Sequence, residues 1–229
     1  MTGLNELHED LERLLPEEAV AGLLQKQRRV QPPPTTGHRV ALRRRLIARY
    51  EGQPPVAAGQ IGIAAFETSL GFIGLALSAQ GITRLALPRP APEAVLSYLR
   101  QDYPGAVLLD PSGLPDYGGQ LRRYARGEPV TFDYEFDLHT LTLFQQTVLA
   151  AARSIPYGQV RTYKEVAAAI GRPKATRAVG NALGKNPVPL MIPCHRVVSS
   201  SGKIGGYSGP GGVVTKRQLL ALERARIGL

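Results

Sequence analysis

The chain contains one cysteine, Cys194, in 229 residues. A single thiol excludes an internal disulfide and a cysteine-cluster zinc site, so neither cross-link can hold this fold together. Hydrophobic residues make up 43% of the sequence, which is enough to bury a core. Cys194 is then either an inert buried thiol, as free cysteines often are, or a reactive thiolate. Its neighbours His195 and Arg196 can each stabilise a negative sulfur, which favours the thiolate.

Basic residues are concentrated in the C-terminal part of the chain. The net charge is +10, and residues 138–229 hold thirteen Lys and Arg against two acids, Glu165 and Glu223. The remaining 137 residues carry a net charge of −1. Such asymmetry indicates a polyanionic partner, most often nucleic acid. A basic surface that only keeps the protein in solution is the alternative.

Targeting and cofactor signals are absent from the sequence. No apolar run approaches the roughly 20 residues of a membrane span. The acidic N-terminus lacks the basic and apolar regions of a signal peptide. There is no phosphate-loop or dinucleotide glycine pattern and no metal-ligand cluster. We therefore expect a cytoplasmic protein that binds no membrane, no cofactor and no metal.

Residues 1–55 form an N-terminal appendage of distinct composition. Leucines recur at helical spacing in its first half, before the triple proline Pro32–Pro34 must stop any helix. Residues 38–50 are strongly basic. This second half is an extra DNA-contacting arm, a solvated helix or a docking site for a partner, and its composition fits all three.

Residues 56–137 have the pattern of a small α/β domain. Short β-prone runs separated by glycine-containing turns predict strands, and longer amphipathic stretches predict helices. The predicted strands are residues 61–66, 71–77, 82–87 and 130–136, and the predicted helices are residues 92–101 and 114–126. None of these segments has catalytic spacing.

Residues 138–229 are predicted to be mostly helical. Thr162 can cap a helix, and Glu165 three residues later completes a capping box. Gly171 ends that helix, and a second, basic helix follows after a few residues, a spacing typical of a helix-turn-helix. Such pairs are usually only structural, but the small residues of the second helix permit close approach to another surface. The predicted helices cover residues 142–154, 163–170, 174–183 and 215–225.

A proline-rich segment leads to the cysteine. Three prolines in the seven residues from Pro187 to Pro193 impose an extended, stiff backbone, and the apolar residues between them indicate burial. Cys194 is therefore held in one fixed place. Downstream, residues 202–212 contain six glycines, whose exposed backbone N–H groups allow a flat ligand to come close.

Together these motifs resemble the O6-alkylguanine-DNA alkyltransferases, also called methylated-DNA–protein-cysteine methyltransferases. The similarity runs from about Ala57 to Glu223, and its most specific part is Pro-Cys-His-Arg preceded by Asn-Pro-Val-Pro. The resemblance implies an α/β, ribonuclease-H-like N-terminal domain and a mostly α, winged-helix-like C-terminal DNA-binding domain. It also implies a monomer that binds double-stranded DNA by the minor groove. The alkyl group of O6-alkylguanine would pass irreversibly to Cys194, with O4-alkylthymine as a second candidate substrate.

The resemblance also assigns DNA contacts. Arg177 matches the arginine that fills the gap left by a flipped-out base. Tyr163 matches the tyrosine that crowds the target phosphate and donates to the base. Leu183 matches an apolar pocket or intercalation position. The backbone around Val197 and the Tyr207–Ser208 loop would recognise the guanine edge and its O6.

The catalytic residues follow from the same resemblance. Cys194 would attack the alkyl carbon in a single displacement. His195 would act through a water as the base that ionises the thiol, and Glu223 would orient His195 and stabilise its cation. Asn186 matches the hinge asparagine between the recognition helix and the cysteine segment.

Three other functions share some of these features. Alkyltransferase-like proteins recognise alkylated guanine without chemistry, but they lack a cysteine at this position. A cysteine hydrolase would need a distant histidine with a supporting motif, and His8, His38 and His139 have none. A transcriptional regulator of the adaptive-response type would need a four-cysteine zinc module, which a single cysteine excludes.

Overall fold

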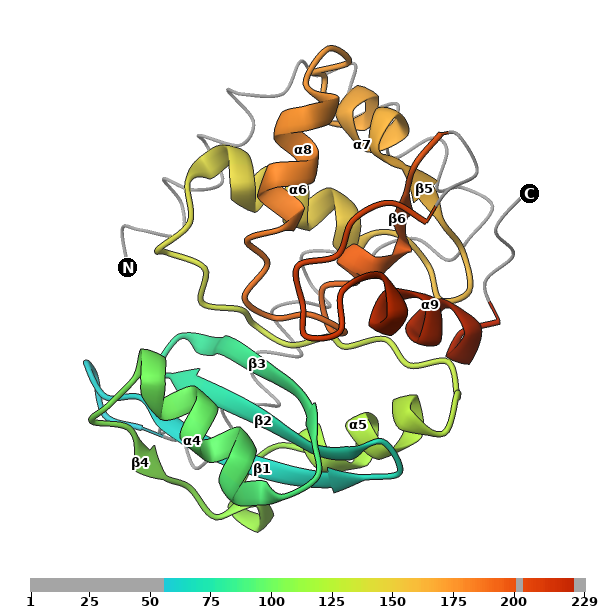
Figure 1. Ribbon diagram of the computed structural model, residues 1–229. Coiled ribbons are helices and arrows are strands. Elements are labelled where there is room, and N and C mark those ends of the chain that lie inside the picture. Colours follow the sequence, from blue (N-terminus) through green and yellow to red (C-terminus); the bar gives the residue numbers. More distant parts are fainter. Residues whose placement is uncertain (1–55, 201–203, 225–229) are drawn as a thin grey trace.

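Figure 1 shows the computed structural model, in which a sheet-containing unit lies below a mostly helical unit. The structure describes residues 56–200 and 204–224. The appendage expected at residues 1–55 lies outside the described residues. The expectation of an α/β unit followed by a mostly α unit is confirmed at this level of detail.

The N-terminal unit is built on a four-stranded sheet in the order β3-β2-β1-β4. The first three strands form an antiparallel meander, and the short β4 pairs parallel with β1. Tight turns at glycines with positive φ link the meander, which is why the strands follow one another with two-residue connections. The strands are β1 (Gly62–Thr68), β2 (Gly71–Ser78), β3 (Gly81–Arg89) and β4 (Val107–Leu108).

The two faces of this sheet have different partners. Successive side chains of a strand point to opposite faces, so each strand contributes to two cores. One face packs against α4 (Pro92–Asp102) through Val95 and Leu99. The other packs against α5 (Tyr117–Ala125) and continues into the core of the helical unit. The two units are therefore joined by apolar packing.

The strand predicted at residues 130–136 is wrong. In the structure this segment makes only one isolated bridge, between Phe136 and Ile82. Phe132 and Tyr134 are nevertheless buried. The alternating pattern therefore records side chains that pack on the core from an extended segment, not a ladder of backbone hydrogen bonds.

Four helices form most of the C-terminal unit. Thr142 and Thr162 each begin a helix with a complete capping box, which confirms the pairing predicted between Thr162 and Glu165. The last helix begins two residues earlier than predicted and ends just before Glu223. The elements are α6 (Leu143–Arg153), β5 (Arg161–Thr162), α7 (Tyr163–Ala169), α8 (Thr176–Leu183), η3 (Cys194–Arg196), β6 (Val197–Val198) and α9 (Val213–Leu222).

Two parallel strands bring the cysteine segment to the start of α7. β5 pairs with β6, with Arg161 opposite Val197 and Thr162 opposite Val198. Because η3 directly precedes β6, this pairing fixes Cys194 close to Tyr163, the first residue of α7. Within the described ranges, no helix is long and apolar enough to cross a membrane.

Candidate active site

The side chain of Asn186 closes the loop that leads to Cys194. Its amide Nδ2 donates to the carbonyl of Ile192 at 2.8 Å, and its Oδ1 accepts from the N–H of Val188 at 3.0 Å. An asparagine that bonds to its own loop on both sides fixes the path of the backbone. The structure thus gives the residue predicted as a hinge a bracing role in this loop.

Two further features hold the same loop in place. Leu190 adopts a left-handed backbone conformation, with φ at 70°, and its side chain is buried. Such a conformation is uncommon for leucine and persists only where the surroundings hold it. The N–H of Leu85, in β3, donates to the carbonyl of Pro187 at 2.9 Å. The cysteine loop is therefore anchored to the sheet of the N-terminal unit.

His195 and Glu223 form a buried pair behind the cysteine. The distance from His195 Nε2 to Glu223 Oε1 is 2.7 Å, and neither side chain is exposed. Arg196 donates to the same carboxylate from Nε, at 2.8 Å, and from its terminal nitrogen, at 3.0 Å. Burial by itself would raise the pKa of Glu223, but these hydrogen bonds outweigh it and lower that pKa to about 2. Glu223 therefore stays ionised.

Arg196 does not have the role expected from the sequence. Its guanidinium is bonded to Glu223 and to the carbonyl of Ile155, the latter at 2.6 Å. The suggestion that Arg196 stabilises the sulfur directly is therefore a misassignment. Its charge instead holds the carboxylate that faces His195.

The imidazole of His195 is arranged as a base. Burial lowers the pKa of His195 more than the Glu223 carboxylate raises it, so the ring is neutral at pH 7. An ionised carboxylate only accepts hydrogen bonds, so Nε2 of His195 must donate to it. The other nitrogen, Nδ1, is then an acceptor, and it is buried without a hydrogen-bond partner among the described residues.

The thiol of Cys194 needs such a base. Its side chain is buried, and burial raises the pKa of the thiol, while the Asn186 amide and the Lys216 ammonium partly oppose this rise. The resting cysteine is therefore a neutral thiol at pH 7. The hydrogen bond from His195 that acts on this thiol within the described residues comes from its backbone N–H and not from its imidazole.

Lys216, on α9, is a site residue that the sequence reasoning missed. It is fully buried, and its Nζ donates to the carbonyls of Val197, at 2.6 Å, and Gly206, at 3.1 Å. Burial lowers the pKa of Lys216 to about 8, and the charge of Cys194 acts in the opposite direction. Its spacing of seven residues from Glu223 places both on one helix face, a signal that could have revealed it.

Tyr124 is a second missed residue, and it comes from the other unit. The hydroxyl of this fully buried α5 side chain donates to Glu223 Oε1 at 2.7 Å and lies 3.4 Å from His195 Nε2. The N-terminal unit thus contributes directly to the arrangement behind Cys194. Nothing in the sequence around Tyr124 marks it, because its partners are 71 and 99 positions away.

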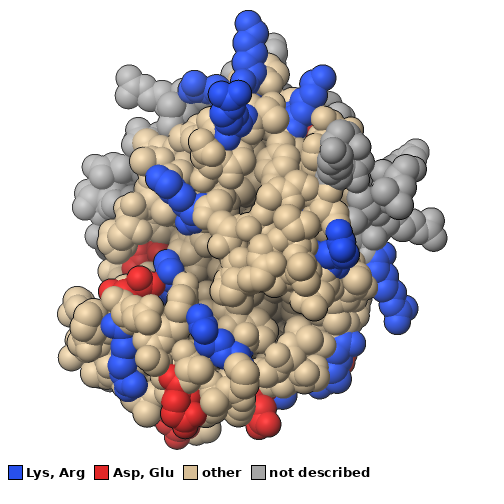
Figure 2. Space-filling model, viewed as in Figure 1, with Lys and Arg blue, Asp and Glu red and all other residues tan. Residues whose placement is uncertain are grey.

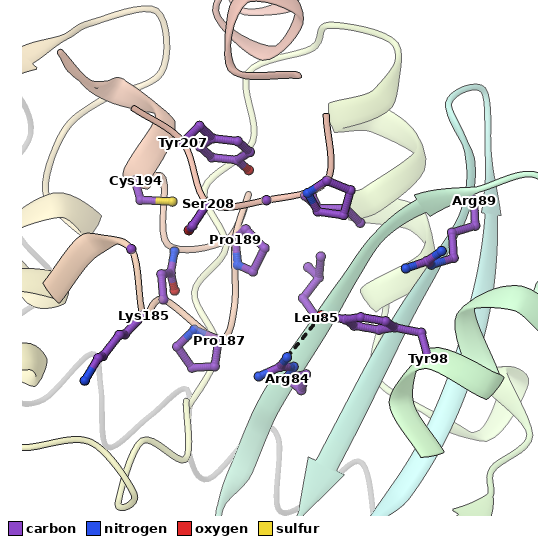
Figure 3. A pocket seen from close by; sticks show the side chains of 15 residues that line it. Arg84, Leu85, Arg89, Tyr98, Lys185, Pro187, Pro189, Cys194, Tyr207 and Ser208 are labelled. Atoms are coloured by element: carbon purple, nitrogen blue, oxygen red, sulfur yellow. Dashed lines mark hydrogen bonds between the residues drawn. The ribbon is translucent and has the colours of Figure 1, made fainter. Parts of the chain in front are cut away.

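A cavity of about 180 Å³ opens in front of the thiol. Figure 3 shows Cys194 at one end of it, with Tyr207 and Ser208 beside the sulfur. Asn186 also lines it, so the structure brings four of the predicted site residues together. Burial raises the pKa of Tyr207, whose buried hydroxyl has no partner among the described residues.

Tyr163 lies at the edge of this site. Its hydroxyl accepts from Lys216 Nζ at 3.5 Å and donates to the carbonyl of Gly206 at 3.4 Å. Burial raises the pKa of Tyr163, and the charge of Cys194 adds to that rise. Gly205 has φ at 77°, and a Cβ there would lie 3.0 Å from the tyrosine ring, so this position requires glycine.

Three predicted DNA contacts lie elsewhere, in different settings. Arg177 is exposed on α8. Leu183 is only 5% exposed and packs in the core, and its place in an apolar pocket or intercalation position on DNA stays a prediction. Val197 is buried, and Lys216 already occupies its carbonyl. A carbonyl oxygen has two lone pairs, so the use of the backbone around Val197 to recognise a base stays a prediction.

Basic side chains are spread over this face of the molecule, and acidic ones are not (Figure 2). Figure 2 shows Lys and Arg side chains over the end of the molecule formed by α7 and α8, while acidic side chains on this face lie mainly over the N-terminal unit. A helix pair flanked by basic residues, beside a cysteine with an oriented imidazole, is typical of a DNA-binding protein with a cysteine nucleophile. That is the class of protein that this fold and site define.

Comparisons with known sequences make the class specific. A family model described as the DNA-binding domain of 6-O-methylguanine DNA methyltransferase matches residues 143–225. The methylated-DNA–protein-cysteine methyltransferase of Mycobacterium tuberculosis is 49% identical over 117 residues, which are 51% of this chain and 69% of that protein. The inducible enzyme of the same name from Bacillus subtilis is 38% identical over 133 residues, 58% of this chain and 73% of that protein. The chain belongs to the methylated-DNA–protein-cysteine methyltransferase family.

Solved structures have the same fold. The crystal structure of Mycobacterium tuberculosis O6-methylguanine methyltransferase aligns with a TM-score of 0.59 at 38% identity, over 72% of this chain and 93% of that one. The Mycobacterium tuberculosis OGT protein in complex with DNA gives 0.59 at 39% identity, over 71% and 92%. The O6-methylguanine-DNA methyltransferase of Pyrococcus kodakaraensis gives 0.54 at 25% identity, over 70% and 98%.

Proposed function

We propose that this protein repairs DNA by transferring the alkyl group of O6-alkylguanine to Sγ of Cys194. The observation that carries the proposal is the buried thiol beside a neutral imidazole, whose Nε2 is held by Glu223 and whose Nδ1 is free to accept a proton. Membership of the methylated-DNA–protein-cysteine methyltransferase family supports the reaction. The geometry of this site supports the roles that we give to individual residues.

The proposed chemistry is one displacement. His195 Nδ1 takes the thiol proton of Cys194 through a water, and Glu223 stabilises the imidazolium that forms. The thiolate attacks the alkyl carbon, the C–O6 bond breaks, and its electron pair leaves on guanine, which then takes up a proton. Tyr163 donates to the leaving base. The product is a thioether, and because the chain has no second cysteine it holds no thiol to reverse the transfer.

We further propose how the DNA is bound. α8 would enter the minor groove, and Arg177 would fill the gap left when the damaged nucleotide is flipped out. The exposure of Arg177 on α8, a helix without acidic residues, supports this role. Residues 56–137 would form a ribonuclease-H-like domain, and residues 138–229 a winged-helix-like domain. The meander of β1 to β3 and the helix pair α7 and α8 support that division.

The direct test of the function is the mass of the peptide that contains Cys194. After incubation with duplex DNA containing O6-methylguanine, we expect that peptide to gain the mass of one CH2 group, in at most one copy per protein molecule. Cys194→Ser should bind the same DNA and gain nothing. An unmodified Cys194 in protein that demonstrably binds the DNA would overturn the proposal.

Arg177→Ala should separate base flipping from chemistry. We expect it to slow repair in duplex DNA by about ten- to a hundredfold, because the flipped state loses the side chain that supports it. The reaction with free O6-benzylguanine should change little, because a free base needs no flipping. Single-turnover rates on the two substrates are the measurement. Arg172→Ala removes the same charge from the exposed turn before α8 and serves as the control. Equal losses on both substrates would contradict the role of Arg177.

A further inference from the structure

The cavity in front of Cys194 does not end at the helical unit. Figure 3 shows it continuing to β3 and α4 of the N-terminal unit, where Arg84, Arg89 and Tyr98 form its far wall. The near end, at Cys194 and Ser208, is the reaction site proposed above. A group attached to the reacting carbon would therefore extend between the two units, towards β3.

The middle of the cavity is apolar. Its walls come from β3, from the proline-rich loop and from the glycine-rich loop. Because a closed apolar cavity of about 150 Å³ holds a benzene ring, a volume of about 180 Å³ has room for a phenyl ring. The apolar residues that line it are Leu85, Leu87, Pro187, Pro189 and Pro210.

The far wall carries excess positive charge. The guanidinium carbons of Arg84 and Arg89 lie 5.7 Å and 4.7 Å from the centre of the Tyr98 ring. Arg84 donates to the Tyr98 hydroxyl at 3.0 Å and pairs with Asp102 at 2.9 Å. Asp102 is the one carboxylate that pairs with either arginine in the described part of the chain. Arg89 is thus a cation on the cavity wall without a paired acid.

We propose that Arg84, Arg89 and Tyr98 form a second subsite, which selects O6-alkylguanines whose alkyl group carries a negative charge at its distal end. An aryl or alkyl spacer would occupy the apolar middle, and a terminal carboxylate would meet the two guanidinium groups, a geometry that suits charge-assisted hydrogen bonds. The inference rests on the proposed function. The bonds made and broken at Cys194 are unchanged, and the carboxylate stays on the transferred group.

The test compares two free bases that differ only in charge. O6-(4-carboxybenzyl)guanine carries the anion, and O6-(4-carbamoylbenzyl)guanine is its neutral counterpart of nearly equal shape. The readout is the rate at which Cys194 gains each adduct, followed by intact mass and expressed as the ratio of the acid to the amide. We expect this ratio to fall about two- to fivefold in Arg89→Gln, as for loss of one partly exposed charge pair.

Arg100→Gln is the matched control, because Arg100 is exposed on α4 and does not line the cavity. Its ratio should stay at the wild-type value. The same ratio in Arg89→Gln and wild type would overturn the subsite. If Arg89→Gln left that ratio unchanged but slowed repair of duplex DNA, the arginine would contact the DNA backbone, and the subsite would again be overturned. If neither base modified Cys194 of the wild-type protein, and alkylated DNA transferred no alkyl group to it either, the proposed function itself would be overturned.

Discussion

Glu223→Gln is expected to slow alkyl transfer to Cys194 by about a thousandfold or more, the scale seen when the acid of a nucleophile–histidine–acid triad loses its charge. The carboxylate sets the orientation of His195 and would stabilise its cation. A neutral amide of the same shape does neither, and it also leaves Arg196 buried without its counter-charge. Single-turnover rates with free O6-benzylguanine measure the effect without any contribution from DNA binding.

Glu128→Gln is the control for this variant. Glu128 also accepts hydrogen bonds from two arginines, Arg123 and Arg126, but these pairs are exposed at the surface. Exposed pairs contribute little, so its rate should match wild type. A rate for Glu223→Gln within a few-fold of the control would contradict the role given to the carboxylate.

The same substitution should change the pH dependence of stability. The pKa of Glu223 is about 2 in the folded protein, against an ordinary value of 4.5. A lowered pKa stabilises the fold above pH 4.5, and this contribution is lost as pH falls from 4.5 towards 2. The difference corresponds to roughly 3 kcal/mol in the free energy of unfolding. Glu223→Gln has no carboxylate to protonate, so its free energy of unfolding should fall less than that of wild type between pH 4.5 and pH 2. If the free energies of unfolding of the two proteins changed in parallel with pH, this prediction would be wrong.

Local patterns predicted the elements that local chemistry controls. The side chains of Thr162 and Glu165 each accept a hydrogen bond from the other residue's backbone N–H at the start of α7. These hydrogen bonds depend only on residues close in sequence, so the sequence was enough to predict them. The meander strands follow from glycine turns and β-prone runs in the same way. The predicted meeting of Glu223 with His195 rested on resemblance, because 28 residues separate them and no local rule joins them.

The rest depended on packing between the two units. Tyr124 reaches Glu223 only because α5 of the N-terminal unit lies against the helical unit. Buried and exposed side chains alternate around Phe132 and Tyr134 with the period of a strand. Only one isolated bridge connects this segment to β3, so it forms no strand of the sheet. Leu183 is buried on the same helix, α8, that carries the exposed Arg177, and local spacing alone does not separate their two settings.

Lys216→Met is expected to slow alkyl transfer by about a hundredfold, the scale for removal of one preorganised electrostatic group from a buried site. Lysine is rarely fully buried without a reason, and methionine has a similar length and suits the apolar surroundings. The ammonium favours the thiolate of Cys194, so its removal raises the pKa of the thiol. The rate of alkyl transfer increases with pH as the thiol ionises, and this increase should therefore occur at a higher pH in the variant than in wild type.

The pKa of Lys216 itself provides a sharper test of this role. Because that pKa is about 8, the wild-type ammonium loses its proton as pH rises through 8, and its advantage over methionine should shrink from there upward. Single-turnover rates of both proteins from pH 6.5 to about pH 9.5, with a thermal melt to establish folding, measure the ratio. Arg217→Met removes the same charge from the adjacent, exposed position of α9 and should keep the wild-type rate. A constant ratio across this range, or an equal loss in Arg217→Met, would mean that Lys216 only holds the Val197 and Gly206 carbonyls and does not favour the thiolate.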